Sequence, residues 1–395
     1  MKLEYHTIVI GAGPAGLMAA SASRESCLIL EGGPRPGRKL LVSGSGQCNF
    51  THDLDVDEFL KRCGNFARFL KPALFMLSPA KLTGHLERLG CQAVVRPDGK
   101  VFPASFQASD VLSAMLKGAL KPSNQLIHTA RITQVNADQG FILTDGQNRE
   151  YRCRKLVIAT GGASWPQTGS DGSGYELARQ LGHQITAPRP ALAAVFIDAY
   201  PFRPCAGISL PGITASFITP AGHKQARGDL LFTHQGLSGP LILDNSHLLV
   251  QGDTIRLCLL EDADARIRRI ISARPKSNIK NALKLTGLPE ALLSVLISLA
   301  RLNPDKRCAE VSAPELKSMA YSLSSSDLKV KNVECLANAM LTAGGVDLGE
   351  LRARDMSSVK VPGLYFAGEI LDYNLPSGGF NIQAACSTGF LAGSR

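Results

Sequence analysis

The sequence feature that most constrains the fold lies near the N-terminus, where a short apolar run leads directly into a glycine-rich turn. The run His6 to Ile10 is rich in β-branched residues, and Gly11 to Gly16 follows it with the spacing G-x-G-x-x-G. The small residues of Leu17 to Ser23 predict a helix, and Cys27 to Leu30 predicts a second strand that ends at Glu31. Strand, turn, helix, strand and acid in this order form a βαβ unit of the length that binds a dinucleotide.

Each part of this unit has a predicted contact with the cofactor. Gly11 permits the tight turn, Gly13 lets backbone N–H groups approach a pyrophosphate, and Gly16 lets the helix pack closely on the sheet. The Glu31 carboxylate is expected to accept hydrogen bonds from ribose hydroxyls, and its charge would repel a 2′-phosphate. The cofactor is therefore predicted to be FAD or NAD rather than NADP. The residues expected around the pyrophosphate are Gly11, Gly13, Pro14, Ala15 and Gly16.

Three further segments favour FAD over NAD, because a simple dehydrogenase does not need them. The first closes a buried strand and brings backbone against the cofactor, and the second places an acid where it can bond a ribityl or ribose hydroxyl. The third opens the last helix, whose N-terminal N–H groups are expected to face the N1/O2 edge of the flavin, where reduction develops negative charge. The expected contacts are Ala159, Thr160, Gly161, Gly368, Glu369, Gly378, Gly379, Phe380, Asn381 and Ile382.

The most distinctive run in the chain extends from Pro36 to Asn49 and reads PGRKLLVSGSGQCN. Its two adjacent cations and the glycine-serine loop after them suit contacts with a diphosphate and an isoalloxazine ring, because such a loop offers N–H donors without bulk. The alternative is that the two cations form a solvated surface pair. The expected cofactor contacts here are Arg38, Lys39, Leu40, Ser43, Gly46, Cys48 and Asn49, with Ile132 added from a later strand.

The composition along the chain predicts several domains. The whole chain of 395 residues is 45% hydrophobic and 19% charged, which excludes a disordered protein. Prolines separate short β-like runs after Ala187, a helical and basic stretch follows, and the small-residue strand pattern returns after Leu328. The predicted class is α/β, with a discontinuous Rossmann-like FAD-binding domain and an insertion in it. The predicted bounds are 1–188 and 328–395 for the FAD domain, 189–260 and 306–327 for a β-rich substrate domain, and 261–305 for a small helical domain.

The spacing of the cysteines and the length of the apolar runs indicate the cellular location of the protein. No two of the ten cysteines lie closer than fifteen residues, so the chain has no C-x-x-C pair, and reduced thiols and no metal site are expected. No secretory leader is expected at the N-terminus, because the apolar run Thr7 to Ile10 is short and is followed at once by glycine. The best apolar stretch elsewhere, Ala291 to Ala300, is shorter than the ~20 residues that span a bilayer. The predicted location is the cytoplasm.

Other motifs extend the pattern over essentially the whole chain. They are Lys100 to Pro103, Leu231 to Pro240, Gly344 to Val346 and Pro362 to Glu369. Together with the segments above, and in the same order, they resemble a bacterial family of FAD-dependent oxidoreductases that includes ribosomal-RNA dihydrouridine synthases, bile-acid-intermediate enone reductases and aminoacetone oxidases. The resemblance implies a split, glutathione-reductase-like FAD domain, an inserted β-barrel-like domain and a small helical domain.

This chain departs from the family pattern at two places. The family motif GGGRCN reads GSGQCN at Gly44 to Asn49, so the arginine beside the flavin is lost at Gln47. The loop Asp372 to Pro376 also differs from the usual one. FAD binding is expected to survive both changes, whereas the substrate is less constrained.

The chemistry expected of such a flavin is transfer of hydride from N5 to a C=C bond conjugated to a carbonyl, with an acid protonating the adjacent carbon. Cys48 lies among the flavin motifs and His234 lies before a glycine turn, so these two are the predicted catalytic residues. Each could instead be structural, Cys48 as a buried thiol and His234 as a hydrogen-bonded histidine. NADPH or NADH is expected to bind only transiently as the reductant, because no second G-x-G-x-x-G unit follows a strand.

A basic segment suggests the substrate. The formal net charge is +10, and the stretch from Arg266 to Lys284 contains no acidic residue. Phosphates are the natural counterpart of such a cluster, so uridine in ribosomal RNA is the favoured substrate. The alternatives are a solvated helical face, a small-molecule enone reductase or amine oxidase, and a non-catalytic flavin-stabilised RNA-binding protein. The predicted RNA contacts are Arg266, Arg268, Arg269, Arg274, Lys276, Lys280 and Lys284.

Overall fold

The computed structural model describes residues 3–395, which form two compact units. The first, here called the split unit, comprises residues 3–191 and 336–395. The second, the inserted unit, is the continuous segment Leu192–Cys335. Each unit buries its own cluster of apolar side chains, so each has an independent hydrophobic core.

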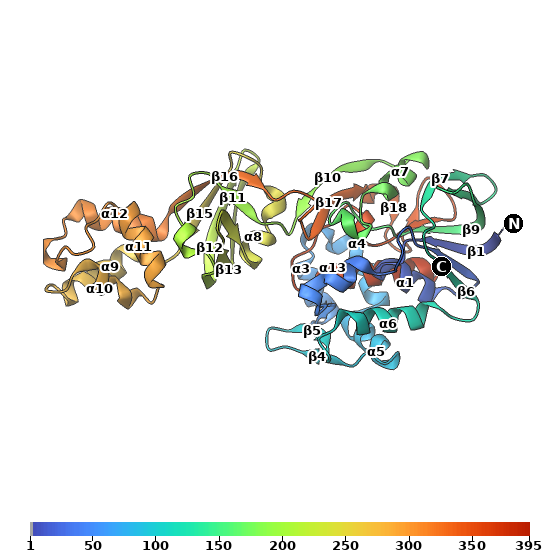
Figure 1. The fold of residues 1–395 in the computed structure, drawn as a ribbon, viewed down its shortest axis with the longest axis horizontal. Coiled ribbons are helices and arrows are strands. Elements are labelled where there is room, and N and C mark those ends of the chain that lie inside the picture. Colours follow the sequence, from blue (N-terminus) through green and yellow to red (C-terminus); the bar gives the residue numbers. More distant parts are fainter. Residues whose placement is uncertain (1–2) are drawn as a thin grey trace. The chain divides into compact units, whose positions relative to one another are not determined.

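A parallel sheet forms the centre of the split unit (Figure 1). Its strand order is β20-β9-β1-β2-β6, and the neighbours pair in parallel. The β2 strand is fully buried along its length, as expected for a parallel sheet covered on both faces. The strands are β1 (Leu3–Ile10), β2 (Cys27–Leu30), β6 (Asn124–Ile127), β9 (Glu150–Ile158) and β20 (Leu364–Phe366). This is the Rossmann-like sheet that the N-terminal motif predicts, and the prediction is confirmed.

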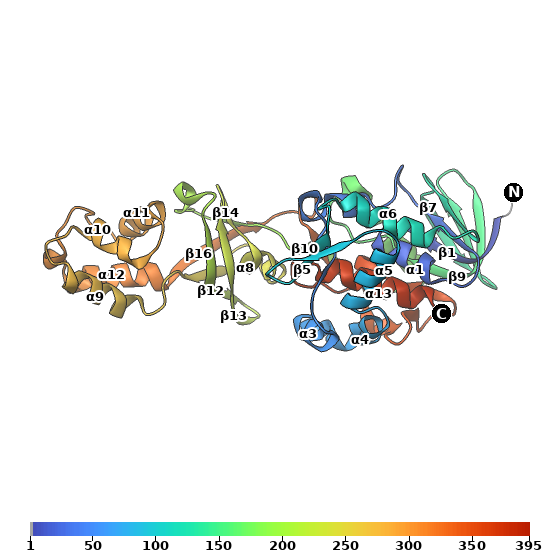
Figure 2. The ribbon, with the colours of Figure 1, turned by 90° about the horizontal axis from the view of Figure 1, so that it is seen from below.

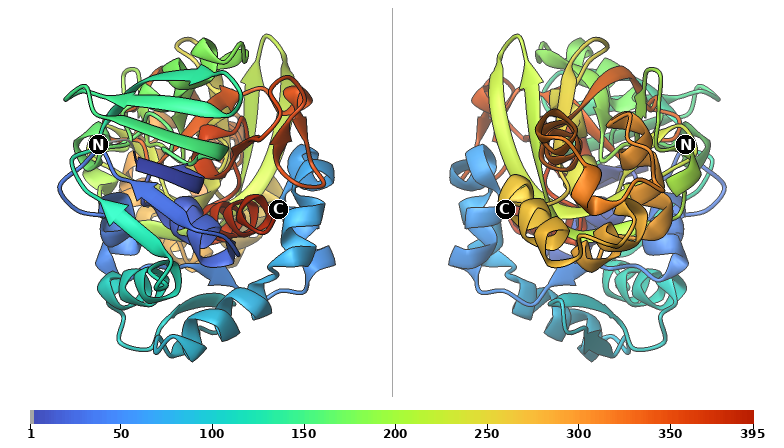
Figure 3. Two further views of the ribbon diagram at one scale, coloured as in Figure 1. Left: turned by 90° about the vertical axis from the view of Figure 1, so that its right-hand side faces the viewer. Right: turned by 90° about the vertical axis from the view of Figure 1, so that its left-hand side faces the viewer.

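Two sets of short antiparallel strands pair with β9 and β20 of this sheet. On β9 they form a hairpin, and on β20 they form a second ribbon. Figure 3 (left) shows the strands fanned side by side. The hairpin is β7 (Ile132–Ala137) and β8 (Phe141–Asp145), and the ribbon is β18 (Leu351–Arg352) and β19 (Ser357–Ser358).

Two helices of small residues pack against each other beside the sheet (Figure 2). They are α1 (Pro14–Ala22) and the C-terminal helix α13 (Phe380–Gly393). A Cβ atom at Gly389 would overlap the backbone of Ala15 on α1, which shows how closely the two helix backbones approach. The C-terminal motifs are thereby brought against the N-terminal glycine turn.

Between α1 and β9 in sequence lie the elements that flank the glycine-serine loop. A small sheet has the order β3-β5-β4, formed by β3 (Thr51–His52), β5 (Lys100–Pro103) and β4 (Ala93–Val95). Residues 56–88 form three helices and a short turn, with breaks at Gly64 and before Pro79. Besides α1 and α13, the helices of the split unit are α2 (Arg38–Val42), α3 (Val56–Arg62), α4 (Ala67–Met76), α5 (Pro79–Arg88), α6 (Ala108–Ala119) and α7 (Ser173–Gln180). A separate two-stranded ribbon consists of β10 (Ile185–Ala191) and β17 (Leu341–Val346).

The inserted unit consists of a closed barrel and a group of helices on one core. The barrel order is β11-β14-β13-β12-β15-β16. Its strands are β11 (Val195–Ile197), β12 (Ser209–Thr219), β13 (Gly222–Phe232), β14 (Gly236–Ser238), β15 (Thr254–Cys258) and β16 (Ser326–Val333). The helices are α8 (Pro240–Leu243), α9 (Ala263–Ala273), α10 (Ile279–Leu283), α11 (Glu290–Leu299) and α12 (Ala313–Ser324). The expected fold class, with an inserted barrel and a helical part, is confirmed.

Two predicted boundaries need correction. Strand β16 pairs with both β11 and β15 and closes the barrel, so the return to the split unit comes at 336 and not at 328. Residues 306–327, expected to be β-rich, contain α12, which begins with a capping box between Ser312 and Glu315. No helix among residues 3–395 is long and apolar enough to cross a membrane.

Candidate nucleotide-binding site

The glycine turn between β1 and α1 has the shape that a pyrophosphate needs. A Cβ atom at Gly16 would overlap the carbonyl oxygen of Gly11, and Gly11 itself has a φ of 102° and lies against the backbone of Ala159. Around a Cβ placed on Gly13, by contrast, no atom lies within 4 Å. Since no side chain caps the N-terminus of α1, its N–H groups are left for an anion in that open space.

The carboxylate of Glu31 is held at the end of β2 by the backbone. Its Oε2 atom accepts a hydrogen bond from the N–H of Ala12 at 2.9 Å, and Oε1 accepts one from Gly33 at 2.7 Å. The N–H of Ala130 in turn donates to the Glu31 carbonyl at 2.9 Å, so the chain leading to Ile132 runs beside this acid. Ile132 itself is buried in β7. The acid thus has a fixed orientation at the place where a ribose is expected.

The glycine-serine loop is built from consecutive left-handed residues. Gly44, Ser45 and Gly46 have φ values of 55°, 56° and 86°, and Cys48 has a φ of 57°. Such conformations are uncommon for residues with a side chain. The loop is closed by its own backbone, since Gln47 N–H donates to the Gly44 carbonyl at 3.1 Å and Cys48 N–H to the Ser43 carbonyl at 3.0 Å. The Ser43 hydroxyl donates to the Leu40 carbonyl at 2.6 Å and is occupied by the end of α2.

The start of α13 meets the end of this loop. A Cβ at Gly379 would lie 2.8 Å from Oδ1 of Asn49, an atom that is buried and has no hydrogen-bond partner among the described residues. An orphaned buried acceptor beside an uncapped helix start fits a ligand that supplies a donor. Phe380 packs on Phe59 with ring centroids 4.6 Å apart, and the Asn381 amide donates to the Leu375 carbonyl at 2.9 Å. Gly378 and Ile382 flank these residues in the chain.

A polar cluster joins α2 to the segment after β20. The Lys39 ammonium lies 2.7 Å from the Glu369 carboxylate and donates to Ser164 Oγ at 2.6 Å. Glu369 Oε1 also accepts from Ser164 Oγ at 2.9 Å and from the N–H of Thr342 at 3.0 Å. Arg38 donates to the carbonyl of Gln167. The surface-pair alternative therefore does not describe Lys39, which is tied to an inner carboxylate.

The segment after β9 reaches the same place. The Thr160 hydroxyl is buried without a hydrogen-bond partner among the described residues, and Gly161 has a φ of 78°. Gly368, with a φ of 79°, donates its N–H to the Thr388 hydroxyl at 3.0 Å and lies against Ala15 of α1. The split unit therefore brings together the N-terminal turn, the loop after α2 and the C-terminal motifs.

The two predicted catalytic residues have different surroundings. Cys48 is fully buried, and burial raises the pKa of its thiol to about 12, so it remains protonated at neutral pH. His234 lies exposed in the turn between β13 and β14 of the inserted unit, whereas the cofactor residues above belong to the split unit. Their roles stay predictions.

Several polar residues of the site carry no recognisable sequence signal. Ser164 and Thr342 are found only through their contacts with Glu369, which lies far from both in the chain. His52 on β3 is another: its Nδ1 atom is buried without a hydrogen-bond partner among the described residues, and burial lowers its pKa. Its ring lies 5.4 Å from that of Phe380 at the start of α13. The one available clue to His52 is its position three residues after the loop motif.

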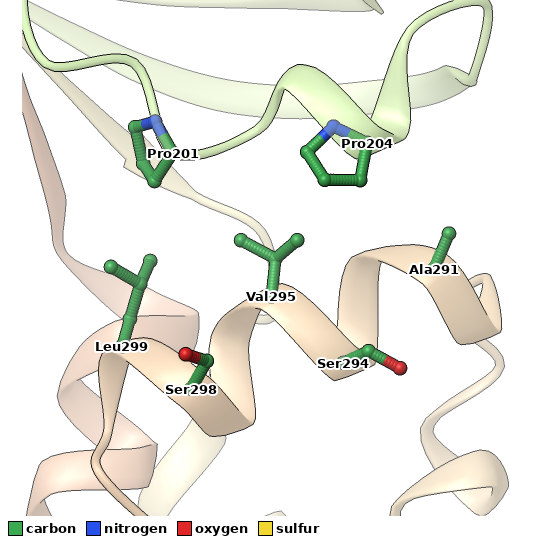
Figure 4. A pocket seen from close by; sticks show the side chains of 7 residues that line it. All are labelled: Pro201, Pro204, Ala291, Ser294, Val295, Ser298 and Leu299. Carbon is green, nitrogen blue, oxygen red and sulfur yellow. The ribbon is translucent and has the colours of Figure 1, made fainter.

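The inserted unit has a groove of another kind (Figure 4). It has a volume of about 380 Å³ and lies between the loop that carries Pro201 and Pro204 and the helix α11. None of its lining side chains titrates, so the groove offers no acid, base or redox group. No group of His, Cys, Asp and Glu among residues 3–395 is arranged to hold a metal ion.

The basic segment is on the surface of the inserted unit, with part of its charge already paired. Arg268 forms an ion pair with Asp264 on α9, and Lys284 forms one with Glu290. Arg266 is half-buried, and the remaining cations are exposed and form no ion pair with a carboxylate among the described residues. These are Arg269, Arg274, Lys276 and Lys280.

Comparison with known proteins places the chain in a family. It is 30% identical over 393 residues to a protein of Escherichia coli named ribosomal RNA dihydrouridine synthase, covering 98% of this chain and 96% of that protein. It is 28% identical to a Clostridium scindens protein named 3-dehydro-bile acid delta(4,6)-reductase, covering 98% and 97%.

Solved structures agree in fold at low sequence identity. A flavocytochrome c3 fumarate reductase is similar with a TM-score of 0.53 and 16% identity, over 99% of this chain and 78% of that one. A 3-ketosteroid delta1-dehydrogenase of Sterolibacterium denitrificans has a TM-score of 0.52 and 13% identity, over 99% and 98%. Residues 5–395 match the family described as the HI0933-like protein Rossmann domain, and the chain belongs to that family.

Proposed function

We propose that this chain is a FAD-dependent reductase that acts on a C=C bond conjugated to a carbonyl. The observation that carries the proposal is the convergence, within the split unit, of an open pyrophosphate turn, an oriented ribose acid at Glu31 and an uncapped α13 facing the orphaned acceptor of Asn49. The turn and Glu31 suit the adenosine and pyrophosphate of FAD, and the start of α13 suits its flavin ring. A mononucleotide would leave one of these two parts of the site unused.

The residues of the site then have distinct tasks. The N–H groups at the start of α1 bind the pyrophosphate, and Glu31 bonds the adenosine ribose. Glu369, held by Lys39 and Ser164, is positioned for a ribityl hydroxyl. When bound, FAD supplies hydride to the electron-poor carbon of the acceptor. The N–H groups at the start of α13 stabilise negative charge at the neighbouring ring edge.

Proton transfer completes the reduction, and it needs an acid near the acceptor. Cys48 and His234 are the candidates put forward from the sequence, and His52 joins them as a titratable group beside Phe380. A Cys48 thiol with a pKa raised to about 12 holds its proton at neutral pH but is a weak acid. The reductant in this proposal is NADPH or NADH, bound transiently.

Uridine in ribosomal RNA is the substrate we favour. Two relatives carry the name ribosomal RNA dihydrouridine synthase, and the exposed cations of α9 and α10 suit an RNA backbone. The second candidate is a small enone, because the Clostridium scindens relative is named as a bile-acid reductase. Both acceptors share a C=C bond next to a carbonyl, so one site chemistry serves either.

The test is a set of anaerobic reactions with the purified, FAD-loaded protein. The flavin is reduced with NADPH or NADH, and its reoxidation is followed after addition of ribosomal RNA lacking dihydrouridine or of 2-cyclohexen-1-one. We expect RNA to restore the oxidised spectrum, with dihydrouridine detected by mass spectrometry of the digest. Turnover of the enone without any RNA product would favour the second candidate. A protein that binds no FAD, or a reduced flavin that reacts with neither acceptor, would contradict the proposal.

A further inference from the structure

The hairpin that joins β4 to β5 presents one arginine in a fixed position beside the glycine-serine loop. The N–H of Arg96 donates to the Lys100 carbonyl at 2.9 Å, and the Arg96 carbonyl accepts from Gly99 at 2.8 Å. The turn residues Pro97, Asp98 and Gly99 suit this geometry, since Gly99 has a φ of 79° and a Cβ there would overlap the ring of His52. The backbone of Arg96 is therefore set before any ligand arrives.

The Arg96 side chain is fixed as well. Its guanidinium carbon lies 4.2 Å from the ring centroid of Phe102 and 5.2 Å from that of Phe106, and Nη2 donates to Gln47 Oε1 at 3.1 Å. Phe102 is buried and its ring reaches 4.0 Å from a Cβ placed on Gly44. The guanidinium thus borders the loop that carries Cys48 and Asn49.

This guanidinium keeps most of its bonding capacity. Arg96 is exposed, and within residues 3–395 no aspartate or glutamate forms an ion pair with it. A guanidinium has five N–H donors, and the contact with Gln47 uses one of its nitrogens. Phe106, beside it, is 37% exposed and holds a left-handed conformation with a φ of 54°. A planar cation and a partly exposed aromatic ring at one spot suit a flat acceptor that presents a carbonyl oxygen.

We propose that Arg96 is a substrate-binding residue that donates hydrogen bonds to the carbonyl oxygen of the acceptor; this rests on the proposed function. Hydride, carrying two electrons, forms a new C–H bond at the far carbon of the C=C–C=O group, and the π pair moves to the oxygen as an enolate. The flavin is oxidised and the acceptor is reduced. A proton then adds to the carbon next to the carbonyl. The guanidinium stabilises the oxygen as its charge develops, which is the step where a fixed cation contributes most.

The test compares R96Q and R96K with the wild type and with the control R179Q, which removes an exposed arginine paired with Glu176 on α7. Acceptor binding is read from the difference spectrum of the oxidised flavin on titration with 2-cyclohexen-1-one or a uridine-containing RNA hairpin. For R96Q we expect unchanged FAD content and unchanged reduction by NAD(P)H. Its acceptor Kd should rise about tenfold and its rate of flavin reoxidation should fall at least tenfold, with partial recovery in R96K and no effect in R179Q.

Three results would count against the assignment, and each has a different meaning. If the wild type turns over an acceptor and R96Q binds and reacts equally well, Arg96 does not bind the substrate. If R96Q loses FAD, the side chain supports the cofactor instead. If the wild type reacts with neither acceptor, the proposed function fails first, and the role of Arg96 in it fails with it.

Discussion

Gly13 and Gly16 of the N-terminal turn both lack a Cβ atom, but the surroundings of the two residues differ. A Cβ on Gly16 would overlap the carbonyl oxygen of Gly11, whereas a Cβ on Gly13 would meet no atom within 4 Å. Gly13 also has φ and ψ of −83° and −177°, which alanine adopts without strain. The fold therefore needs Gly16, whereas Gly13 is needed only by what binds there.

This contrast predicts different outcomes for two alanine variants. G13A should unfold within about 1 kcal/mol of the wild type but bind FAD at least tenfold more weakly, since its methyl group occupies the space of the pyrophosphate. G16A should lose roughly 1–3 kcal/mol of stability as well, because backbone atoms must move. Thermal unfolding of the FAD-free proteins and quenching of flavin fluorescence measure the two effects. A G13A variant with wild-type FAD affinity would place the pyrophosphate elsewhere.

At this scale the sequence predicts those contacts whose geometry is local. The turn glycines and Glu31 follow from a βαβ pattern in which all spacings are short. The contacts of Glu369 with Lys39 and Ser164 do not follow from any sequence pattern, because 330 residues separate Lys39 from Glu369 and no periodicity links them. Arg96 carries no such signal either, because its contact with Gln47 spans 49 residues.

Among the elements, β9 and the end of α13 are joined by a buried lysine. Lys155 donates to the carbonyl of Gly393 at 3.0 Å, and its ammonium lies 4.8 Å from the ring centroid of Tyr365. Burial lowers the pKa of Lys155 from 10.5 to about 8. The folded chain therefore releases this proton at a lower pH than the unfolded chain does.

The sign of the resulting pH dependence is opposite to that of the buried cysteines. Between pH 8 and about 10.5 the unfolded chain holds the Lys155 proton and the folded chain does not, so this group adds stability as the pH rises. Buried thiols such as Cys48, whose pKa is raised from 9.0 to about 12, remove stability as the pH rises between those two values. Relative to K155M, the wild type should therefore gain on the order of 1–3 kcal/mol between pH 8 and 10.5.

Urea unfolding of both proteins at several pH values measures this difference. The variant K61M, which alters an exposed lysine paired with Glu58, serves as the control. Its free energy of unfolding should change with pH in parallel with that of the wild type. If the free energies of unfolding of the wild type and K155M changed in parallel with pH, Lys155 would have its ordinary pKa in the folded chain.

How far elements can be predicted depends on where their partners lie in the chain. Strand β1 and helix α1 carry their own signals, and both appear where the motif places them. Strand β16 carries a signal for a strand but none for its sheet, since closing a barrel is a pairing between distant segments. Helix α12 was assigned to the β-rich region although the S-x-x-E pattern at Ser312 was present in the sequence.

For the whole molecule, the central fact is that the two units have separate cores and are joined by two chain crossings. At the crossing, β10 and β17 pair antiparallel, with Ala191 opposite Leu341. Residue 191 thus lies opposite a residue five positions after 336. A glycine-serine linker can therefore join the ends left by removing residues 192–335.

We expect the protein with residues 192–335 replaced by such a linker to fold and bind FAD. It should lose salt-dependent binding to an RNA hairpin, because the basic segment is removed with the inserted unit. Flavin absorbance and filter binding over a range of salt concentrations measure the two properties. Retention of RNA affinity would move the RNA contacts to the split unit, and a colourless product would show that FAD binding needs both units.

One cysteine is a natural site for chemical labelling. Of the ten cysteines, Cys335 alone is exposed, and it is the last residue before the chain returns to the split unit. Exposed thiols react with maleimides far faster than buried ones. A dye could thus be coupled at this junction without any engineered mutation, and a flavin bound in the split unit would act as its native energy-transfer partner.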